Sequence, residues 1–150
     1  MKHNSIVPNL ILYLTLILIP PIPGATIVKD FDLPINFYGS GHRGIDYLSK
    51  VNEPVLASAD GYVSHQGLIA NRWTISITHS QFRTTYEPVR PIVKLGQIVK
   101  SGEIIGYLEL NGSHCFPQSC LHFGLKEGKF YFNPVLNFKR NYPKLLPIYS

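Results

Sequence analysis

The stretch WTISITHSQFRTTYE (Trp73–Glu87) decides the fold class. In residues 73–79, apolar side chains at every second position alternate with Thr and Ser, which is the period of a strand with two different faces. Residues 82–87 form a second short strand pattern, and Ser80 and Gln81 separate the two. The pair predicts a β-hairpin, and therefore an antiparallel sheet.

The flanking sequence continues this pattern of short strands and tight turns. No helical pattern of about ten residues alternates with the strands, which disfavours a parallel α/β sheet. The 12 glycines and 12 prolines suit a chain with many turns. Further strands are expected within residues 54–67, 93–110, 120–125 and 130–132. We predict an all-β protein, an antiparallel β-sandwich or flattened barrel.

Length and charge limit the function classes. The 150 residues suffice for one domain with a core, and the formal net charge of +5 favours acidic partners. The chain has no basic run with interleaved aromatic residues, so we expect no nucleic-acid partner.

The N-terminus has the composition of an export signal. Lys2 and His3 precede the apolar residues 10–19, and PPIPGA follows them. The apolar segment is shorter than the about 20 residues that span a bilayer. We therefore predict a signal peptide over residues 1–25, with an uncleaved anchor as the alternative. A secreted or cell-envelope domain would then occupy residues 26–138, followed by a basic tail, residues 139–150.

Three side chains form a candidate zinc site. His42 and Asp46 have an H-x-x-x-D spacing, and His122 alternates with the large apolar residues Leu121 and Phe123. Two imidazoles and a carboxylate match the three protein ligands of catalytic zinc sites, which leave a fourth position open. The spacing alone is weak evidence, because most such pairs are ordinary surface or turn residues.

Longer motifs make the sequence recognisable. GHRGIDY (41–47), PVLASADGYVSHQG (54–67), RTTYEPV (83–89) and CLHFGL (120–125) follow one another in the order and spacing of a known family. The sequence resembles the lysostaphin-like zinc endopeptidases, also called LytM-type domains, which cut peptide cross-links of bacterial cell walls. The resemblance implies an antiparallel β-sandwich with zinc held by His42, Asp46 and His122.

The sequence departs from the family at two positions. The family's last motif is H-x-H, and Cys120 stands where its first histidine belongs. The family's Y-x-H motif is YEP here, so Tyr86 is kept and Pro88 replaces the histidine. In the family these two histidines assist the reaction. Strand alternation puts Glu87 on the face opposite Tyr86 and position 88, so we expect that only a bulge would let Glu87 take over.

The two cysteines leave three alternatives open. An exported protein favours a Cys115–Cys120 disulfide, which would hold His114 near the end of the metal strand. A free Cys120 thiolate would instead be a fourth zinc ligand and would close the site. Catalysis by Cys120 or His114 in place of a missing histidine is the third alternative.

The resemblance implies one principal function and leaves two rivals. The first is a secreted zinc endopeptidase acting on peptidoglycan cross-links, with altered acid–base residues. The second is a non-cutting module of the same fold that binds zinc or peptidoglycan, or that regulates a partner hydrolase. The third is a sugar-phosphotransferase phosphocarrier. Residues 42–46, HRGID, imitate the motif that carries the phosphate-accepting histidine of such proteins. An export signal argues against this rival, because the phosphate donor is cytoplasmic.

Overall fold

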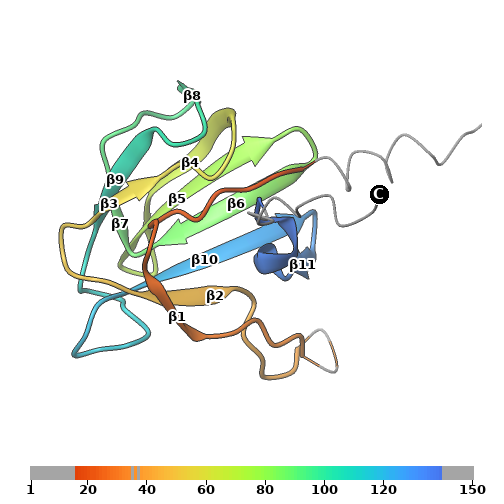
Figure 1. Cartoon of the computed structure of the whole chain (residues 1–150), viewed down its shortest axis with the longest axis vertical. Coiled ribbons are helices and arrows are strands. Elements are labelled where there is room, and N and C mark those ends of the chain that lie inside the picture. Colours follow the sequence, from red (N-terminus) through yellow and green to blue (C-terminus); the bar gives the residue numbers. More distant parts are fainter. Residues whose placement is uncertain (1–15, 35, 37, 140–150) are drawn as a thin grey trace, which may run out of the picture.

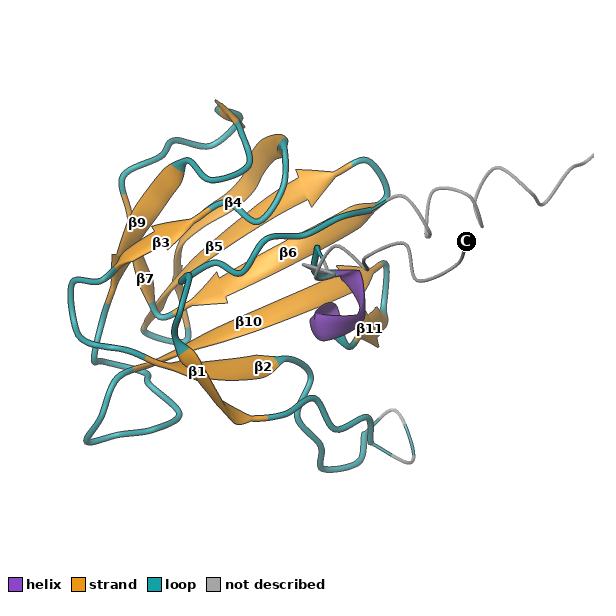
Figure 2. Ribbon diagram, in the orientation of Figure 1, coloured by secondary structure: helices purple, strands orange, loops and turns teal. Residues whose placement is uncertain are grey.

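Most of the strands form one large antiparallel sheet (Figures 1 and 2). The computed structural model describes residues 16–34, 36 and 38–139. The large sheet has the strand order β1-β2-β10-β6-β5-β4-β8, with β11 paired to β10. Its strands are β1 (Thr26–Lys29), β2 (Ile45–Leu48), β4 (Gly61–Ile69), β5 (Arg72–His79), β6 (Phe82–Glu87), β8 (Ile98–Val99), β10 (Cys120–Glu127) and β11 (Phe130–Phe132).

A smaller sheet completes the fold. It has the order β3-β9-β7, from β3 (Pro54–Leu56), β9 (Ile104–Leu108) and β7 (Val89–Pro91). The one helical element described is a 3₁₀ turn, η1 (Pro134–Asn137). Every pair of named strands is antiparallel, so the predicted all-β antiparallel class is confirmed. Within the described ranges, no helix has the length and apolar character needed to cross a membrane.

The predicted hairpin at residues 73–87 is the centre of the large sheet. β5 and β6 pair from Ile75↔Tyr86 to His79↔Phe82. Ile75 and Tyr86 are completely buried in the core. The other face of the hairpin carries polar and charged side chains, in agreement with the alternation in the sequence. The metal site and a groove lie on this polar face.

The residues just before β1 pack against the domain. Leu18 and Ile22 belong to the buried core. Leu18 also lies beside the C-terminal end, where its N–H donates to Asn137 O (2.8 Å) and its carbonyl accepts from Lys139 N–H (2.9 Å). Residues 1–15 and 140–150, most of the predicted signal peptide and tail, lie outside the described residues. Cleavage near residue 25 stays a prediction, and a cut there would remove two core side chains.

Candidate metal centre

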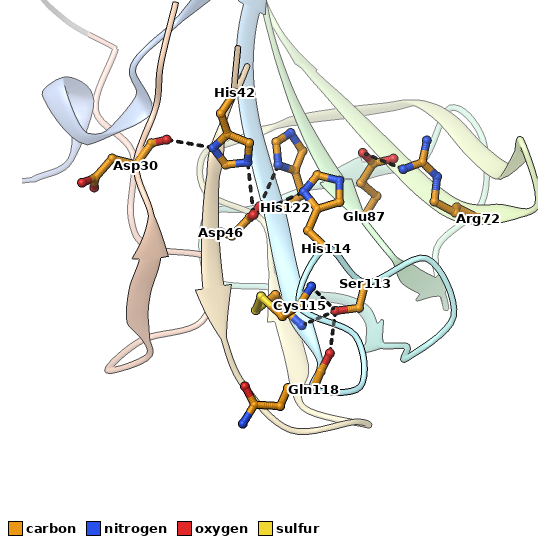
Figure 3. A network of polar contacts seen from close by, with 11 residues as sticks. Asp30, His42, Asp46, Arg72, Glu87, Ser113, His114, Cys115, Gln118 and His122 are labelled. Carbon is orange, nitrogen blue, oxygen red and sulfur yellow. Dashed lines mark hydrogen bonds and ion pairs between the residues drawn. A yellow bond between two sulfur atoms is a disulfide. The ribbon is translucent and has the colours of Figure 1, made fainter. Parts of the chain in front are cut away.

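Strand pairing brings the three predicted ligands together. Asp46 on β2 and His122 on β10 are register partners, although 76 positions separate them in the chain. Cross-strand partners point to the same side of a sheet, so both side chains face the polar side. His42 lies just before β2, where it forms an isolated bridge with Asp32. The close-up in Figure 3 shows the three side chains converging, with His114 beside them.

The Asp46 carboxylate lies at the centre of the cluster. Its Oδ1 lies 2.8 Å from His122 Nδ1, and its Oδ2 lies 3.1 Å from His42 Nε2 and 3.2 Å from His114 Nδ1. One donor atom from each of the four residues can be chosen so that all lie within 4.8 Å of one another. Such a compact set of nitrogen and oxygen donors suits a single divalent ion.

The orientation of His42 supports a metal-binding role. Its Nδ1 lies 2.8 Å from the Asp30 carbonyl, and because a carbonyl only accepts, Nδ1 carries the proton. In the neutral ring Nε2 therefore presents a lone pair. This Nε2 is buried, has no hydrogen-bond partner, and faces a carboxylate oxygen that also has only lone pairs. A cation bound by this nitrogen and the carboxylate would give Nε2 the partner that it lacks, and a second contact that fixes the tautomer is usual for metal-binding histidines.

Gly44 explains why the first motif reads HRGID. A Cβ on Gly44 would lie 2.7 Å from His122 Cε1 and would also clash with the Phe123 carbonyl oxygen. Any larger residue would push the His122 ring or separate β2 from β10. Gly44 thus allows the His122 ring to lie directly against the segment that carries His42 and Asp46.

A disulfide loop presents His114 to the cluster. Cys115 and Cys120 are bonded, with 5.6 Å between their Cα atoms, so the expected disulfide is present. The Ser113 hydroxyl accepts from the N–H groups of both cysteines (3.1 and 2.9 Å) and donates to Gln118 O (2.8 Å). These bonds fix the loop next to His114. Cys120 is consumed by the disulfide and has no thiolate to offer as a fourth ligand or as a nucleophile.

The charges of the cluster favour its ionised form. Burial alone would raise the pKa of Asp46, but hydrogen bonds and charge from His114 and His122 outweigh it and hold that pKa well below its usual range. The hydrogen bond to Asp46 raises the pKa of His114, against the opposing effect of burial. Asp46 is therefore an anion that is 1 % exposed and surrounded by imidazoles.

Glu87 also faces the cluster. It is the register partner of His122 on the neighbouring strand β6, so the two side chains share a face. Its carboxylate lies 4.0 Å from Arg72 Nη1 and accepts a weak hydrogen bond from Thr74 Oγ1 (3.4 Å). The alternation expected from the sequence holds, because Tyr86 points into the core. The expectation that Glu87 would need a bulge to reach the site was wrong, because the face opposite Tyr86 is the site face.

Tyr86 and His79 lie on the other side of the sheet. The Tyr86 hydroxyl accepts from Ser58 N–H (3.0 Å) and lies 2.9 Å from Thr84 Oγ1, which contacts His79 Nε2 (2.7 Å). Burial raises the pKa of Tyr86 and lowers that of His79. This network holds core strands together and does not reach the metal ligands.

Known proteins are similar to this chain in sequence and in fold. The protein Rv2891 of Mycobacterium tuberculosis is 33% identical over 136 residues, which are 87% of this chain and 55% of that protein. The chain thus spans about half the length of this relative. The peptidoglycan DD-endopeptidase ShyC of Vibrio cholerae is 33% identical over 104 residues, 67% of this chain and 24% of that enzyme.

Solved structures agree with this comparison. Csd3 of Helicobacter pylori superposes with a TM-score of 0.69 at 25% identity, over 87% of this chain and 37% of Csd3. The catalytic domain of lysostaphin from Staphylococcus simulans gives a TM-score of 0.64 at 23% identity, over 75% of this chain and 90% of that domain, and supports the fold alone. The model of peptidase family M23 matches residues 40–134, most of the described chain. By this match, and by the architecture around His42, Asp46 and His122, the chain belongs to peptidase family M23.

Proposed function

We propose that this protein is a zinc endopeptidase that cuts peptide cross-links of bacterial peptidoglycan outside the cytoplasm. The observation that carries the proposal is the buried, unpartnered His42 Nε2 facing Asp46 in a cluster that His122 completes. Family membership and the similarity to a peptidoglycan DD-endopeptidase support the substrate. The disulfide and the apolar N-terminus support an extracytoplasmic location.

Zinc fits the donors that the chain supplies. His42 Nε2, the Asp46 carboxylate and a ring nitrogen of His122 would hold the ion, which is the three-ligand set of catalytic zinc sites. A bound zinc supplies a Lewis acid for the scissile carbonyl.

Two further side chains of the site face are suited to moving protons. Glu87 offers a carboxylate opposite His122, and we assign it the role of general base, which accepts the proton lost by the attacking water. His114 uses Nδ1 to bind Asp46, which leaves Nε2 to give a proton to the leaving amine. The side chain of His114 is 32 % exposed, so a substrate can reach it. Glu87 and His114 would thus perform the task of the two histidines that positions 88 and 120 lack.

The same geometry supports a non-cutting module as the second candidate. One ring nitrogen of His114 lies close enough to the other donors to serve as a fourth ligand. Four protein ligands would close the coordination sphere, as in structural zinc sites. Such a protein would hold zinc or the wall peptide, or would regulate a partner hydrolase, without cleavage.

A cleavage assay separates the two candidates. The zinc-loaded full chain is incubated with cross-linked stem peptides, and new amino termini are counted together with zinc per chain. The enzyme predicts one zinc and new termini, both lost in His42→Ala. The module predicts one zinc and no cleavage, and a chain that neither binds zinc nor cuts contradicts both candidates.

A second variant tests proton transfer. Glu87→Gln should keep one zinc per chain and lower the cleavage rate at least about 100-fold, since a placed acid or base contributes about 10²–10⁴-fold. Glu53→Gln is the matched control, because Glu53 is also partly buried and ion-paired, with Lys50 at 3.8 Å, but lies outside the site. Equal rates in the two variants would exclude the role assigned to Glu87.

A further inference from the structure

A groove of about 490 Å³ continues from the metal site along the polar face of the large sheet. One end is lined by His122 and Glu87, and the other by Lys126 and Arg83. Successive register partners of β10 and β6 place these pairs: His122↔Glu87 at one end and Lys126↔Arg83 at the other. The groove therefore follows the direction of these two strands.

Small residues form the floor of the groove between these ends. The intervening pair is Gly124↔Thr85, and a Cβ on Gly124 would lie 2.6 Å from Thr85 Oγ1. On β5 the lining residues are Thr74 and Ser76, both buried and short. The short side chains along this strip leave room for an extended peptide whose backbone can hydrogen-bond to hydroxyl groups, and the larger His65 and Ile69 also line the groove.

The groove is positively charged away from the metal. Arg43, Arg83 and Lys126 line it, and the centroid of the Tyr131 ring lies 6.0 Å from the Arg43 guanidinium carbon and 5.1 Å from Lys126 Nζ. Among the described residues that line the groove, Glu87 is the one carboxylate, and it faces Arg72. Arginine and lysine attract carboxylates through charge-assisted hydrogen bonds, and arginine can bind both oxygens.

The spacing sets where a bound carboxylate would lie. His122 and Lys126 are four residues apart on one strand, which corresponds to about 13 Å at about 3.3 Å per residue. An extended peptide covers this distance in about four residues. We propose that the groove binds a carboxylate-bearing peptide, with the free carboxylate at Arg83 and Lys126, three to four residues from the bond beside the metal. This inference rests on the proposed function, because it takes the scissile bond to lie beside His122.

Binding is tested without cleavage. The wild-type chain is kept in a chelator, and its affinity is measured by fluorescence anisotropy for two labelled cross-linked stem-peptide dimers. One dimer has free carboxylates, and in the other they are carboxamides. The free form should bind about tenfold more tightly, a difference of about 1.4 kcal/mol. This preference should shrink in 0.5 M salt, because salt screens charges in an open groove.

Variants assign the preference to the groove. Arg83→Gln and Lys126→Gln should each lower the affinity for the free-carboxylate dimer several-fold and leave the carboxamide dimer unaffected. Arg83→Lys should restore part of the preference. Arg90→Gln and Lys94→Gln are controls, because both residues are exposed and neither lines the groove. Circular dichroism confirms that each variant is folded.

Three results would overturn the inference. The two dimers could bind equally, or the control variants could lose as much affinity as the groove variants. In the third, inorganic polyphosphate of equal charge would displace the labelled dimer as effectively as the free-carboxylate peptide does. The last result would indicate general anion binding. A carboxylate preference without cleavage by the zinc-loaded chain would leave the groove assignment intact and refute the proposed function. Cleavage without any carboxylate preference would refute the groove assignment and leave the proposed function intact.

Discussion

Removing the Cys115–Cys120 disulfide should damage both stability and activity, by amounts that can be separated. The two cysteines are five positions apart, so the bond closes a six-residue loop. Chain-entropy arguments give a stabilisation of about 2 kcal/mol for a loop of this size. For a domain of this length, that corresponds to a fall in melting temperature of about 5–10 °C. Cys115→Ala/Cys120→Ala should show this fall in calorimetry.

The same variant should lose most of its cleavage activity at temperatures where it is still folded. The disulfide and the Ser113 hydrogen bonds hold the loop that presents His114, whose Nδ1 lies 3.2 Å from Asp46 Oδ2. Without this support the imidazole no longer has a fixed position, and proton transfer by a placed group is worth about 10²–10⁴-fold. Zinc should stay bound, because His42, Asp46 and His122 do not depend on the loop.

His114→Ala separates the two effects. It should lower activity as much as the double cysteine variant does, but it should cost only about 1 kcal/mol of stability, because the lost hydrogen bond to Asp46 is partly exposed to solvent. A double cysteine variant that cuts at the wild-type rate while His114→Ala does not would refute the positioning role of the disulfide. Full activity in both variants would remove His114 from the mechanism.

Three further predictions follow from other parts of the structure. Gly44→Ala should weaken zinc binding at least about tenfold in a chelator competition, because the added Cβ lies 2.7 Å from His122 Cε1; unchanged affinity would contradict the close approach. Burial lowers the pKa of His79, so this side chain takes up a proton more readily in the unfolded chain than in the folded chain. The free energy of unfolding, measured in urea, should therefore fall as the pH drops below about 6.5. His79→Gln should flatten this dependence, and an unchanged slope would assign it to another group. A chain that starts at residue 26 should be about 3–6 kcal/mol less stable than one that starts at residue 16, because a buried leucine and a buried isoleucine are lost; equal urea midpoints would show that residues 16–25 do not stabilise the domain.

The sequence was sufficient to predict the strand class and to nominate three side chains, His42, Asp46 and His122, that the structure brings together. Alternation in residues 73–87 follows from one face being core and the other polar, so the β5–β6 hairpin could be predicted directly. The H-x-x-x-D spacing and the alternation of His122 with Leu121 and Phe123 made the three residues candidates, and the resemblance to a known family implied that they form one ligand set. That they meet depends on β2 pairing with β10, which no local pattern encodes.

Other features depend on tertiary contacts. Strands were expected within residues 54–67, but no local pattern shows that the two strands there, β3 and β4, belong to different sheets. The role of Cys120 stayed open because a cysteine at this position suits a disulfide and a metal thiolate equally well. The loop held by Ser113, which brings Cys115 to Cys120, distinguishes the two roles. The position of Glu87 was read correctly relative to Tyr86. Its relevance was missed because the sequence does not show which side of the strand carries the metal.

The contact between Leu18 and the C-terminal end has a consequence for how the domain is attached to its surroundings. Leu18 hydrogen-bonds to both Asn137 and Lys139, so the two ends of the described chain leave the domain from one place. Any anchor before residue 16 and any polymer bound by the tail would therefore hold the domain at a single edge. Attachment at one edge would restrain the orientation of the domain less than attachment at two separate points.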